Sequence, residues 1–372
     1  MKTEDEWYVI KNVEKVDTPS FAIYPDRIKE NISTLKHFVH DVNRLRPHIK
    51  THKSAEVTKL LLDSGIKKFK CATIAEAEML AMAEAPDILL AYQPIGPKAQ
   101  RFATLVKKYP RIKFSCLIDN IDSAHYLNTI FQAINYRLPV FIDLNTGMNR
   151  TGIQSGTQAL ELYIKAQKLT NIRPVGLHVY DGHIRDQDIF TRTQRCNDAY
   201  EKVTTLERNL AMYGISRPII VAGGTPTLPI HARRADVECS PGTFIYWDKG
   251  YHDNLPEQDF IYAALIVTRI ISKPTDDTIC IDLGHKSIAS ENALANRVHF
   301  LNATNIVPVS HSEEHMVLRV KHKHEFKVGN VLYGVPYHVC PTCALYDTAT
   351  VVKNHEANAQ LKIESRSRVL TI

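Results

Sequence analysis

The stretch of residues 46–92, RPHIKTHKSAEVTKLLLDSGIKKFKCATIAEAEMLAMAEAPDILLAY, decides the fold, because short β-rich runs alternate in it with helical runs. Thr73 and Glu76 form a capping-box pattern that opens one of these helices. The alternation continues to about residue 242 and includes a long helical pattern at Thr191–Met212. It predicts strands at Arg46–Lys50, Lys68–Ala72, Asp87–Tyr92, Lys113–Asp119, Leu138–Asn145, Val175–Asp181, Ile219–Gly224 and Ala235–Cys239.

Eight strands that alternate with helices predict an α/β fold, a closed parallel (β/α)8 barrel of the TIM type. An open doubly wound sheet is the alternative arrangement for such a pattern. That sheet usually carries a GxGxxG motif after its first strand, and the chain has none. The barrel is therefore the favoured fold.

After about residue 255 the alternation stops, and β-branched runs follow one another without a long helical pattern between them. These runs predict a second, all-β domain over residues 256–372. The short β-rich segments of residues 1–17 are expected to pair with it, which leaves residues 18–255 for the barrel. The strands expected in the second domain are Ala263–Ser272, Thr278–Leu283, His315–Val320, Asn330–Val339, Thr348–Val352 and Ser367–Ile372.

Composition is ordinary for a soluble globular protein, with 44% hydrophobic and 23% charged residues among 372. The amino terminus is acidic and lacks the apolar segment of a signal peptide. No run of about 18 apolar residues suggests a membrane span. Seven cysteines, an odd and scattered number, fit a reducing cytoplasm better than a secreted disulfide framework.

The net charge of +6 is modest and suits a site that binds a phosphate and a carboxylate. The basic stretch Lys321–Lys327 is short, includes a glutamate and has one aromatic residue. We interpret it as a solvated turn or strand edge and expect no nucleic-acid partner.

Polar and glycine residues collect after the predicted barrel strands, where the carboxyl ends of all strands share one rim. The loops after the last two strands are rich in glycine, which lets backbone amides approach a phosphate, and in threonine, which adds hydroxyl donors. Simple turns are the alternative reading of these loops. The residues that would bind the phosphate are Gly223, Gly224, Thr225, Gly242 and Thr243.

Lys50 ends the first predicted strand, so its side chain can reach the barrel mouth. His48, His52 and Lys53 flank it and disfavour its charged form, and a neutral amine is nucleophilic enough to form a Schiff base. A surface lysine whose stem lies along apolar groups is the alternative. The residues alone leave both readings open.

The motif Arg46–Lys53, RPHIKTHK, closely resembles the signature of D-threonine aldolases and D-serine dehydratases. These are fold-type III pyridoxal-phosphate (PLP) enzymes, related more distantly to alanine racemase. The similarity extends over most of the chain. The other matching segments follow in the family's order: Asp17–Ser20, Asn145–Gly152, Gly176–Gly182, Gly223–Thr227, Ser240–Thr243 and His338–Thr342.

This resemblance implies that Lys50 carries the cofactor and that the glycine and threonine loops hold its phosphate. It implies that Arg150 lies near the pyridine ring and its 3-oxygen, that Tyr180 packs on the ring face, and that Gln93 approaches the ring edge. It also implies a homodimer, in which the β-rich domain of one subunit completes the other subunit's site.

The resemblance further implies a divalent metal, zinc, manganese or magnesium, bound by the C-terminal domain. His338 and Cys340 stand two residues apart in a predicted β-run, so both side chains would point to one face. Cys340 and Cys343 also form a Cys-x-x-Cys, for which a zinc knuckle or a redox pair is the alternative. The chain has no second such pair to complete a knuckle.

A metal that binds the β-hydroxyl of a D-3-hydroxy amino acid leaves two reactions open. Loss of the hydroxyl proton cleaves the Cα–Cβ bond, as in D-threonine aldolase, and elimination of the hydroxyl gives a 2-oxo acid, as in D-serine dehydratase. Cys340 favours the dehydratase, whereas the other motifs favour the aldolase, which we expect. The expected aldolase base is His183, with Asp186 a little further on.

Three other classes remain as alternatives. An amino-acid racemase needs a second base, for which Tyr333, Tyr337 and Tyr346 are available. A non-catalytic PLP carrier normally lacks the C-terminal domain. A metallohydrolase without PLP would use His178, Asp181 and His183 as metal ligands.

Overall fold

The computed structural model describes residues 6–320 and 325–372, so residues 321–324 of the predicted basic turn lie outside it. The chain divides into two compact units. The barrel unit comprises Leu35–Lys50, Val57–Gly242 and Ser367–Ile372. The β unit comprises the residues up to Thr34, Thr51–Glu56 and Thr243–Arg366. This division differs from the predicted boundary between residues 255 and 256 and from the assignment of residues 18–34 to the barrel.

A curved parallel sheet forms the centre of the barrel unit, every residue of which is described. Seven strands follow one another in chain order, and a short strand β6 (Ile153–Gln154) pairs with β5. The seven are β2 (Lys68–Cys71), β3 (Asp87–Leu90), β4 (Lys113–Ile118), β5 (Leu138–Asn145), β7 (Ile172–Val179), β8 (Ile219–Ala222) and β9 (Val237–Cys239). Each corresponds to a predicted strand.

The predicted first strand, Arg46–Lys50, is wrong as a regular strand, although its backbone completes the barrel. Leu45 forms a parallel bridge with Cys239 of β9, and His48 forms one with Lys70 of β2. Pro47 has no amide hydrogen, and residues 49–51 turn into a 3-10 helix, so the run stops short of a full ladder. The segment still bonds to both edge strands, and the predicted (β/α)8 fold is confirmed.

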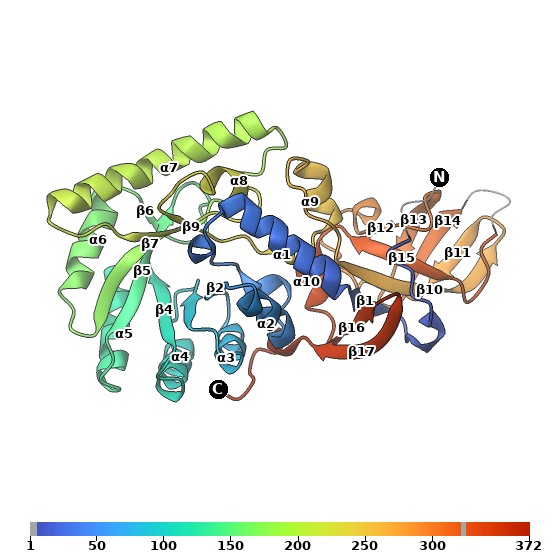
Figure 1. Cartoon of the computed structure of the whole chain (residues 1–372), viewed down its shortest axis with the longest axis horizontal. Coiled ribbons are helices and arrows are strands. Elements are labelled where there is room, and N and C mark those ends of the chain that lie inside the picture. Colours follow the sequence, from blue (N-terminus) through green and yellow to red (C-terminus); the bar gives the residue numbers. More distant parts are fainter. Residues whose placement is uncertain (1–5, 321–324) are drawn as a thin grey trace. The chain divides into compact units, whose positions relative to one another are not determined.

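Helices lie around the outside of this sheet (Figure 1). The predicted capping box at Thr73 is confirmed in part. Its hydroxyl accepts from Glu76 N at 3.0 Å, while the Glu76 carboxylate accepts from Ala72 N. Helices α1 and α2 have residues in both units. The helices are α1 (Pro25–Val39), α2 (Ala55–Asp63), α3 (Ile74–Met82), α4 (Pro97–Lys108), α5 (Ile121–Gln132), α6 (Thr157–Gln167), α7 (Ile189–Met212) and α8 (Leu228–His231).

The barrel interior is packed rather than hollow. Leu89, Leu117, Phe141 and Val221, from four different strands, form one buried apolar cluster. Such layers of side chains fill parallel barrels. Polar side chains further along the same strands therefore lie at the mouth, at the carboxyl ends.

The β unit contains a mainly antiparallel sheet, in which nine strands lie within the described residues. Within the described residues the first strand is β1 (Ser20–Ile23), and no strand precedes it from residue 6 on; it pairs with β10 (Ala264–Thr275) and β16 (Thr348–Lys353). Two short helices, α9 (Lys249–Asn254) and α10 (Val339–Cys343), accompany the sheet. Its strands are β1 (Ser20–Ile23), β10 (Ala264–Thr275), β11 (Thr278–Ile281), β12 (Val298–Phe300), β13 (Ile306–His311), β14 (Met316–Val320), β15 (Val331–Pro336), β16 (Thr348–Lys353) and β17 (Glu356–Lys362).

Two predicted strands of this region need correction. The run Asn330–Val339 ends as a strand at Pro336, and residues 339–343 form α10 instead. Ser367–Ile372 forms no strand, because its backbone bonds to side chains of the barrel unit. Glu78 accepts from the amide of Ile372 at 3.2 Å, and Arg101 donates to the Ile372 carbonyl at 2.7 Å.

None of the seven cysteines, all of which lie within the described residues, forms a disulfide bond, in line with their number and spacing. No helix within the described residues is both long and apolar enough to cross a membrane.

Candidate active site

Three cationic side chains surround the ring of Tyr180, which directly follows β7. The distances to the ring centroid are 6.0 Å from Lys50 Nζ, 5.7 Å from Lys70 Nζ and 4.9 Å from Arg150 Cζ. We call Lys50, Lys70 and Arg150 the cation cluster. The sequence indicated Lys50, Arg150 and Tyr180 but missed Lys70. A mouth with this charge suits an anionic ligand.

Glycines lie close around Tyr180 and leave its ring against bare backbone. A Cβ atom at Gly182 would lie 2.3 Å from the Tyr180 hydroxyl oxygen, and one at Gly224 would lie 3.3 Å from Cε2. A side chain at Gly182 would therefore displace the ring. The glycine loop after β8 and the aromatic ring after β7 thus form one surface.

Threonine hydroxyls bind amides of the two glycine loops. Gly224 N donates to Thr227 Oγ1 at 3.3 Å, and Gly242 N donates to Thr225 Oγ1 at 3.2 Å. Gly223, at φ +75°, takes the left-handed conformation that favours glycine and donates to the carbonyl of Val179. The loops after β8 and β9 are therefore joined, and two of their amides face oxygen acceptors.

The predicted phosphate residue Thr243 belongs to the β unit rather than to the barrel unit. It is buried there, and its hydroxyl oxygen lies 3.6 Å from Cys340 Sγ.

A buried polar network supports the loop after β8. Asp181 accepts from the Thr227 hydroxyl and from His231 Nε2, each at 2.8 Å. Asp181, Cys196 and His231 are close enough to hold one metal ion. Arg234 donates to His231 Nδ1, and burial raises the pKa of the Cys196 thiol to about 12. Because these donors already have protein partners, we interpret the group as a support for the loop.

Gln93 connects two carboxylates at the ends of β4 and β5. Its amide nitrogen donates to Asp119 at 3.0 Å and to Asp143 at 2.8 Å. Asp143 also contacts His178 Nδ1 at 2.7 Å. His178 Nε2 is buried and has no hydrogen-bond partner in the part of the chain that is described. Such an atom is available to a ligand.

The predicted base His183 lies against the loop after β5. A Cβ atom at Gly147 would lie 2.6 Å from His183 Nε2, while Nδ1 is buried and unpartnered within residues 6–320 and 325–372. Burial lowers the pKa of His183, which favours the neutral ring, the form that can accept a proton. Asp186, the other candidate, binds Arg195 at 2.7 Å.

The metallohydrolase alternative requires His178, Asp181 and His183 to share one ion. Each of the first two has a different partner, and these three residues form no ion-sized group among those described. The structure therefore gives that alternative no support.

The predicted metal pair lies at the start of α10 in the β unit. His338 Nδ1 contacts Glu291 at 2.5 Å, and Cys340 Sγ lies 3.1 Å from the Thr51 hydroxyl oxygen. Burial lowers the pKa of His338, but contacts with Cys340, Glu291 and Asp248 outweigh this and raise it. The ring and the thiol thus adjoin through a helical turn, not through the alternation of a strand.

Comparison with known proteins identifies both parts of the chain. Residues 23–249 match the model of the alanine racemase N-terminal domain, and residues 263–352 match a putative serine dehydratase domain. The chain belongs to the alanine racemase N-terminal domain family. The resemblance inferred from the sequence is confirmed.

Similar proteins of this family cover nearly the whole chain. A D-threonine aldolase from Arthrobacter sp is 28% identical over 354 residues, which span 91% of this chain and 90% of that protein. A 3-hydroxy-D-aspartate aldolase from Paracoccus denitrificans is 23% identical, over 95% and 93% of the two chains. The crystal structure of D-threonine aldolase from Filomicrobium marinum has the same fold, with a TM-score of 0.87, 23% identity and coverage of 95% and 96%.

Two of the tyrosines considered for a racemase have structural partners within the β unit. The Tyr333 hydroxyl accepts from the amide of Ile10 at 3.1 Å, and the Tyr346 hydroxyl donates to the carbonyl of Ser287 at 2.7 Å. These contacts account for both hydroxyl groups without a catalytic role.

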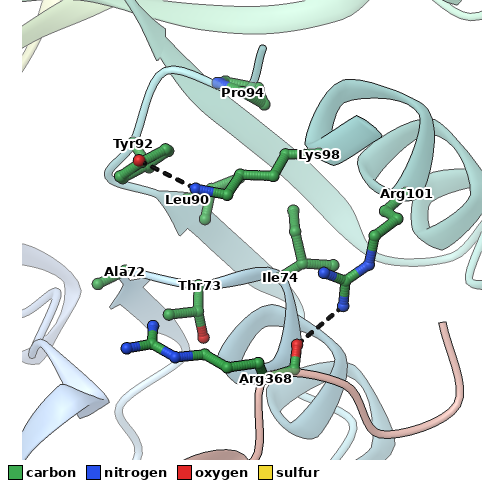
Figure 2. Close-up of a pocket in the computed structure, with 9 residues that line it drawn as sticks. All are labelled: Ala72, Thr73, Ile74, Leu90, Tyr92, Pro94, Lys98, Arg101 and Arg368. Carbon is green, nitrogen blue, oxygen red and sulfur yellow. Dashed lines mark hydrogen bonds between the residues drawn. The ribbon is translucent and has the colours of Figure 1, made fainter. Parts of the chain in front are cut away.

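A cavity of about 350 Å³ lies beside the carboxyl ends of β2 and β3 (Figure 2). Its basic side chains, Lys98, Arg101 and Arg368, face it without an acidic neighbour in its lining. Lys98 donates to the Tyr92 hydroxyl at 3.0 Å, and Arg101 donates to the Arg368 carbonyl at 2.9 Å (Figure 2). The cavity contains none of the predicted site residues, so the candidate active site is the barrel mouth.

Proposed function

We propose that this enzyme is a PLP- and divalent-metal-dependent lyase of D-3-hydroxy amino acids, with D-threonine aldolase activity that yields glycine and an aldehyde. The observation that carries the proposal is the position of Lys50 in the cation cluster beside the Tyr180 ring. The similarity to a D-threonine aldolase and to a 3-hydroxy-D-aspartate aldolase supports the reaction class.

The residues of the barrel mouth fit PLP. Lys50 supplies the amine that attaches the cofactor, Tyr180 an aromatic face, and Arg150 a cation for its anionic ring oxygen. The amides of Gly224 and Gly242 already face hydroxyl oxygens, which phosphate oxygens would replace. Bound PLP supplies an electron sink next to the substrate's α-carbon, so that bonds at this carbon can break.

We assign His183 as the proton acceptor for the substrate's β-hydroxyl group. Burial lowers the pKa of this ring and so favours its neutral form, and Nδ1 has no hydrogen-bond partner within the described chain. The ring lies against the loop after β5, where the absence of a side chain at Gly147 leaves room for it. Removal of the hydroxyl proton is the step that an aldol cleavage requires.

His338 and Cys340 fit a zinc ion better than manganese or magnesium, because nitrogen and sulfur ligands favour zinc. Glu291 would hold the His338 ring through Nδ1 and leave Nε2 for the metal, as carboxylates commonly do at zinc sites. The metal would act as a Lewis acid toward a hydroxyl group.

We expect Glu291→Gln to weaken zinc binding by about tenfold, because the His338 ring would lose the carboxylate that holds it. Competition with a chromogenic chelator measures the affinity, and Glu314→Gln is the control.

The reaction is tested by supplying D-threonine and D-serine to the purified enzyme, with and without a chelator, and identifying the carbon products. Glycine and acetaldehyde from D-threonine, lost on chelation, are expected. Release of neither an aldehyde nor a 2-oxo acid from any D-3-hydroxy amino acid would contradict the proposal.

D-serine dehydratase is the second candidate, and two observations favour it. His338 and Cys340 match the histidine-cysteine pair of zinc-dependent dehydratases, and residues 263–352 match the putative serine dehydratase domain. Lys50 would then take the α-proton, and a metal held by His338 and Cys340 would supply Lewis acidity toward the leaving hydroxyl group. Pyruvate and ammonia from D-serine would select this reaction.

We further propose that the enzyme acts as a cytoplasmic homodimer, in line with the family resemblance. Light scattering on the purified protein is expected to give twice the 42.2 kDa mass of one chain. A monomer mass at micromolar concentration would contradict this assembly.

A further inference from the structure

Lys70 is a buried amine that the proposed mechanism does not use. It occupies the third position of β2 and is only 2% exposed, between the fully buried Phe69 and Cys71. Its nitrogen lies 5.7 Å from the centroid of the Tyr180 ring. Within the described residues this nitrogen makes no hydrogen bond or ion pair.

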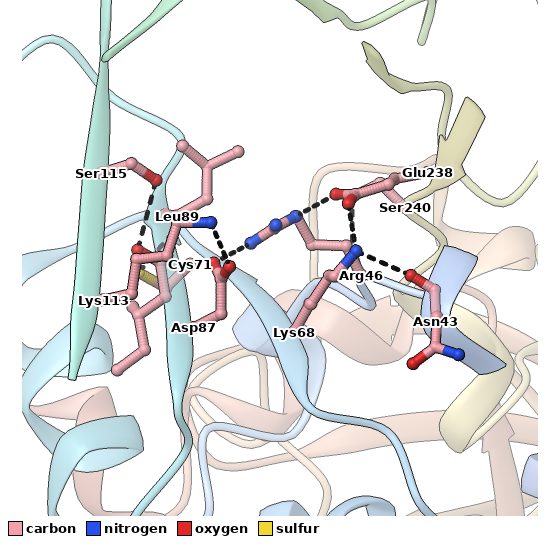
Figure 3. Close-up of polar contacts among 11 residues, drawn as sticks. Asn43, Arg46, Lys68, Cys71, Asp87, Leu89, Lys113, Ser115, Glu238 and Ser240 are labelled. Atoms are coloured by element: carbon pink, nitrogen blue, oxygen red, sulfur yellow. Dashed lines mark hydrogen bonds and ion pairs between the residues drawn. The ribbon is translucent and has the colours of Figure 1, made fainter. Parts of the chain in front are cut away.

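Arg46 is a buried cation of the same barrel with a structural role. Its guanidinium bonds to Asp87 and to Glu238, each at 2.6 Å (Figure 3). Burial lowers the pKa of Arg46, but the two carboxylates outweigh burial and raise it. Full pairing of this kind is normal for buried charges. Lys70 departs from it.

The carboxylates near Lys70 do not offset the lowering of its pKa by burial. Burial lowers its pKa to about 7, and the Lys50 charge acts in the same direction, as does Arg46 more weakly. Asp181 and Asp143 oppose them, but both carboxylates accept from other side chains: Asp181 from Thr227 and His231, and Asp143 from Gln93 and Thr151, with a contact to His178. Lys70 thus lacks an anion of its own.

We propose that Lys70 is a second ligand-binding amine of the cofactor site, which donates a hydrogen bond to an anionic oxygen of bound PLP. The inference rests on the proposed function. The geometric basis is the shared ring: Lys50 and Arg150, both assigned to the cofactor above, lie beside the Tyr180 ring together with Lys70. An anionic oxygen beside Tyr180 would supply the partner that the protein does not provide.

The test measures PLP affinity on the full chain after removal of the cofactor, by titration of its visible absorbance. We expect Lys70→Met to weaken PLP binding at least about tenfold, because a charge-assisted hydrogen bond is lost. Lys70→Arg, which keeps the charge, is expected to retain part of the affinity. The pH at which the bound cofactor changes colour should also rise in Lys70→Met, since a positive neighbour disfavours protonation.

Lys68→Met is the matched control, because Lys68 lies on the same strand and pairs with Glu238 at 2.5 Å. It should bind PLP like the wild type. Thermal melting of each cofactor-free variant checks that it is folded. If Lys70→Met binds PLP as tightly as the wild type, or affects only KM for the amino acid, the inference is wrong. If the wild type itself does not bind PLP, the proposed function fails instead.

Discussion

The two ends of the barrel both gather charged side chains but pair them differently. At the amino-terminal end, Arg46, Lys68, Asp87, Lys113 and Glu238 form an ion-pair cluster with carboxylates between the cations (Figure 3). At the mouth, the cation cluster surrounds one aromatic ring, and no carboxylate among the described residues bonds to its buried member, Lys70.

This difference in pairing distinguishes charged side chains that stabilise the fold from charged side chains that we expect to bind a ligand. A buried cation with two carboxylate partners stabilises the native state, because removing it leaves those carboxylates uncompensated. A buried cation without a partner costs stability until an anion arrives. The unpaired cation at the mouth therefore lowers the free energy of unfolding of the cofactor-free protein, and a bound cofactor is expected to restore it. Removing a buried cation should destabilise the protein at the amino-terminal end and stabilise it at the mouth.

The largest effect is expected for Lys50→Ala at the mouth. Loss of the amine that attaches the cofactor should reduce turnover of D-threonine by at least about a thousandfold, with little change in the melting temperature of the cofactor-free protein. Steady-state kinetics measure the loss. Lys59→Ala, on the exposed face of α2, is the control and should keep wild-type activity.

Arg46→Met should have the next largest effect, on stability. The change leaves Asp87 and Glu238 without their shared partner, so the free energy of unfolding should fall by about 3 kcal/mol. Urea unfolding of the cofactor-free protein measures the fall. An unchanged midpoint would show that the ion-pair cluster does not hold the barrel.

Lys70→Met should change stability in the opposite direction. Replacing an unpartnered amine by an apolar side chain is expected to raise the free energy of unfolding of the cofactor-free protein by about 1 kcal/mol at pH 6. A loss of stability would mean that Lys70 is a structural residue like Arg46.

The pH dependence of this difference follows from the lowered pKa of Lys70. Below pH 7 both the native and the unfolded chain carry the proton, so the cost of the buried charge is complete. Between about 7 and the usual value of 10.5 only the unfolded chain binds it, so wild-type stability rises with pH. The advantage of Lys70→Met should therefore shrink across this window in unfolding curves.

The smallest effect is expected for Lys113→Met in the ion-pair cluster. Lys113 pairs with Asp87 at 2.8 Å, but its side chain is 45% exposed, and Arg46 continues to hold the carboxylate. Exposed pairs contribute little, so the loss should be below about 1 kcal/mol. A loss as large as that of Arg46→Met would show that exposure does not separate the members of the cluster.

The barrel could be predicted from the sequence because its strands are short apolar runs bounded by helical patterns. The strand at Leu138–Asn145 has the predicted bounds, and the others differ by a few residues. The strand predictions were wrong where contacts with residues distant in the sequence, rather than local composition, determine the backbone conformation. Residues 367–372 are β-branched at three positions, yet the amides of the last two bond to Glu78, which lies far away in the sequence.

The candidate site was predictable where a motif or a glycine loop carried it, as at Lys50, Arg150 and Gly224. Lys70 was missed because a lysine in a strand usually faces solvent, and only closure of the barrel turns this position inward. The alternation of Lys68 and Lys70 was a signal that could have indicated it. The pairing of Asp181 with His231, fifty residues apart in the chain, left no pattern to recognise.

The most direct test of the account locates the cofactor on the chain. The PLP-bound enzyme is treated with borohydride, which fixes the bond between cofactor and amine, then digested and mapped by mass spectrometry. The account predicts the label on Lys50 alone. A label on another lysine, or a chain that takes up no label although it turns over D-threonine, would contradict it.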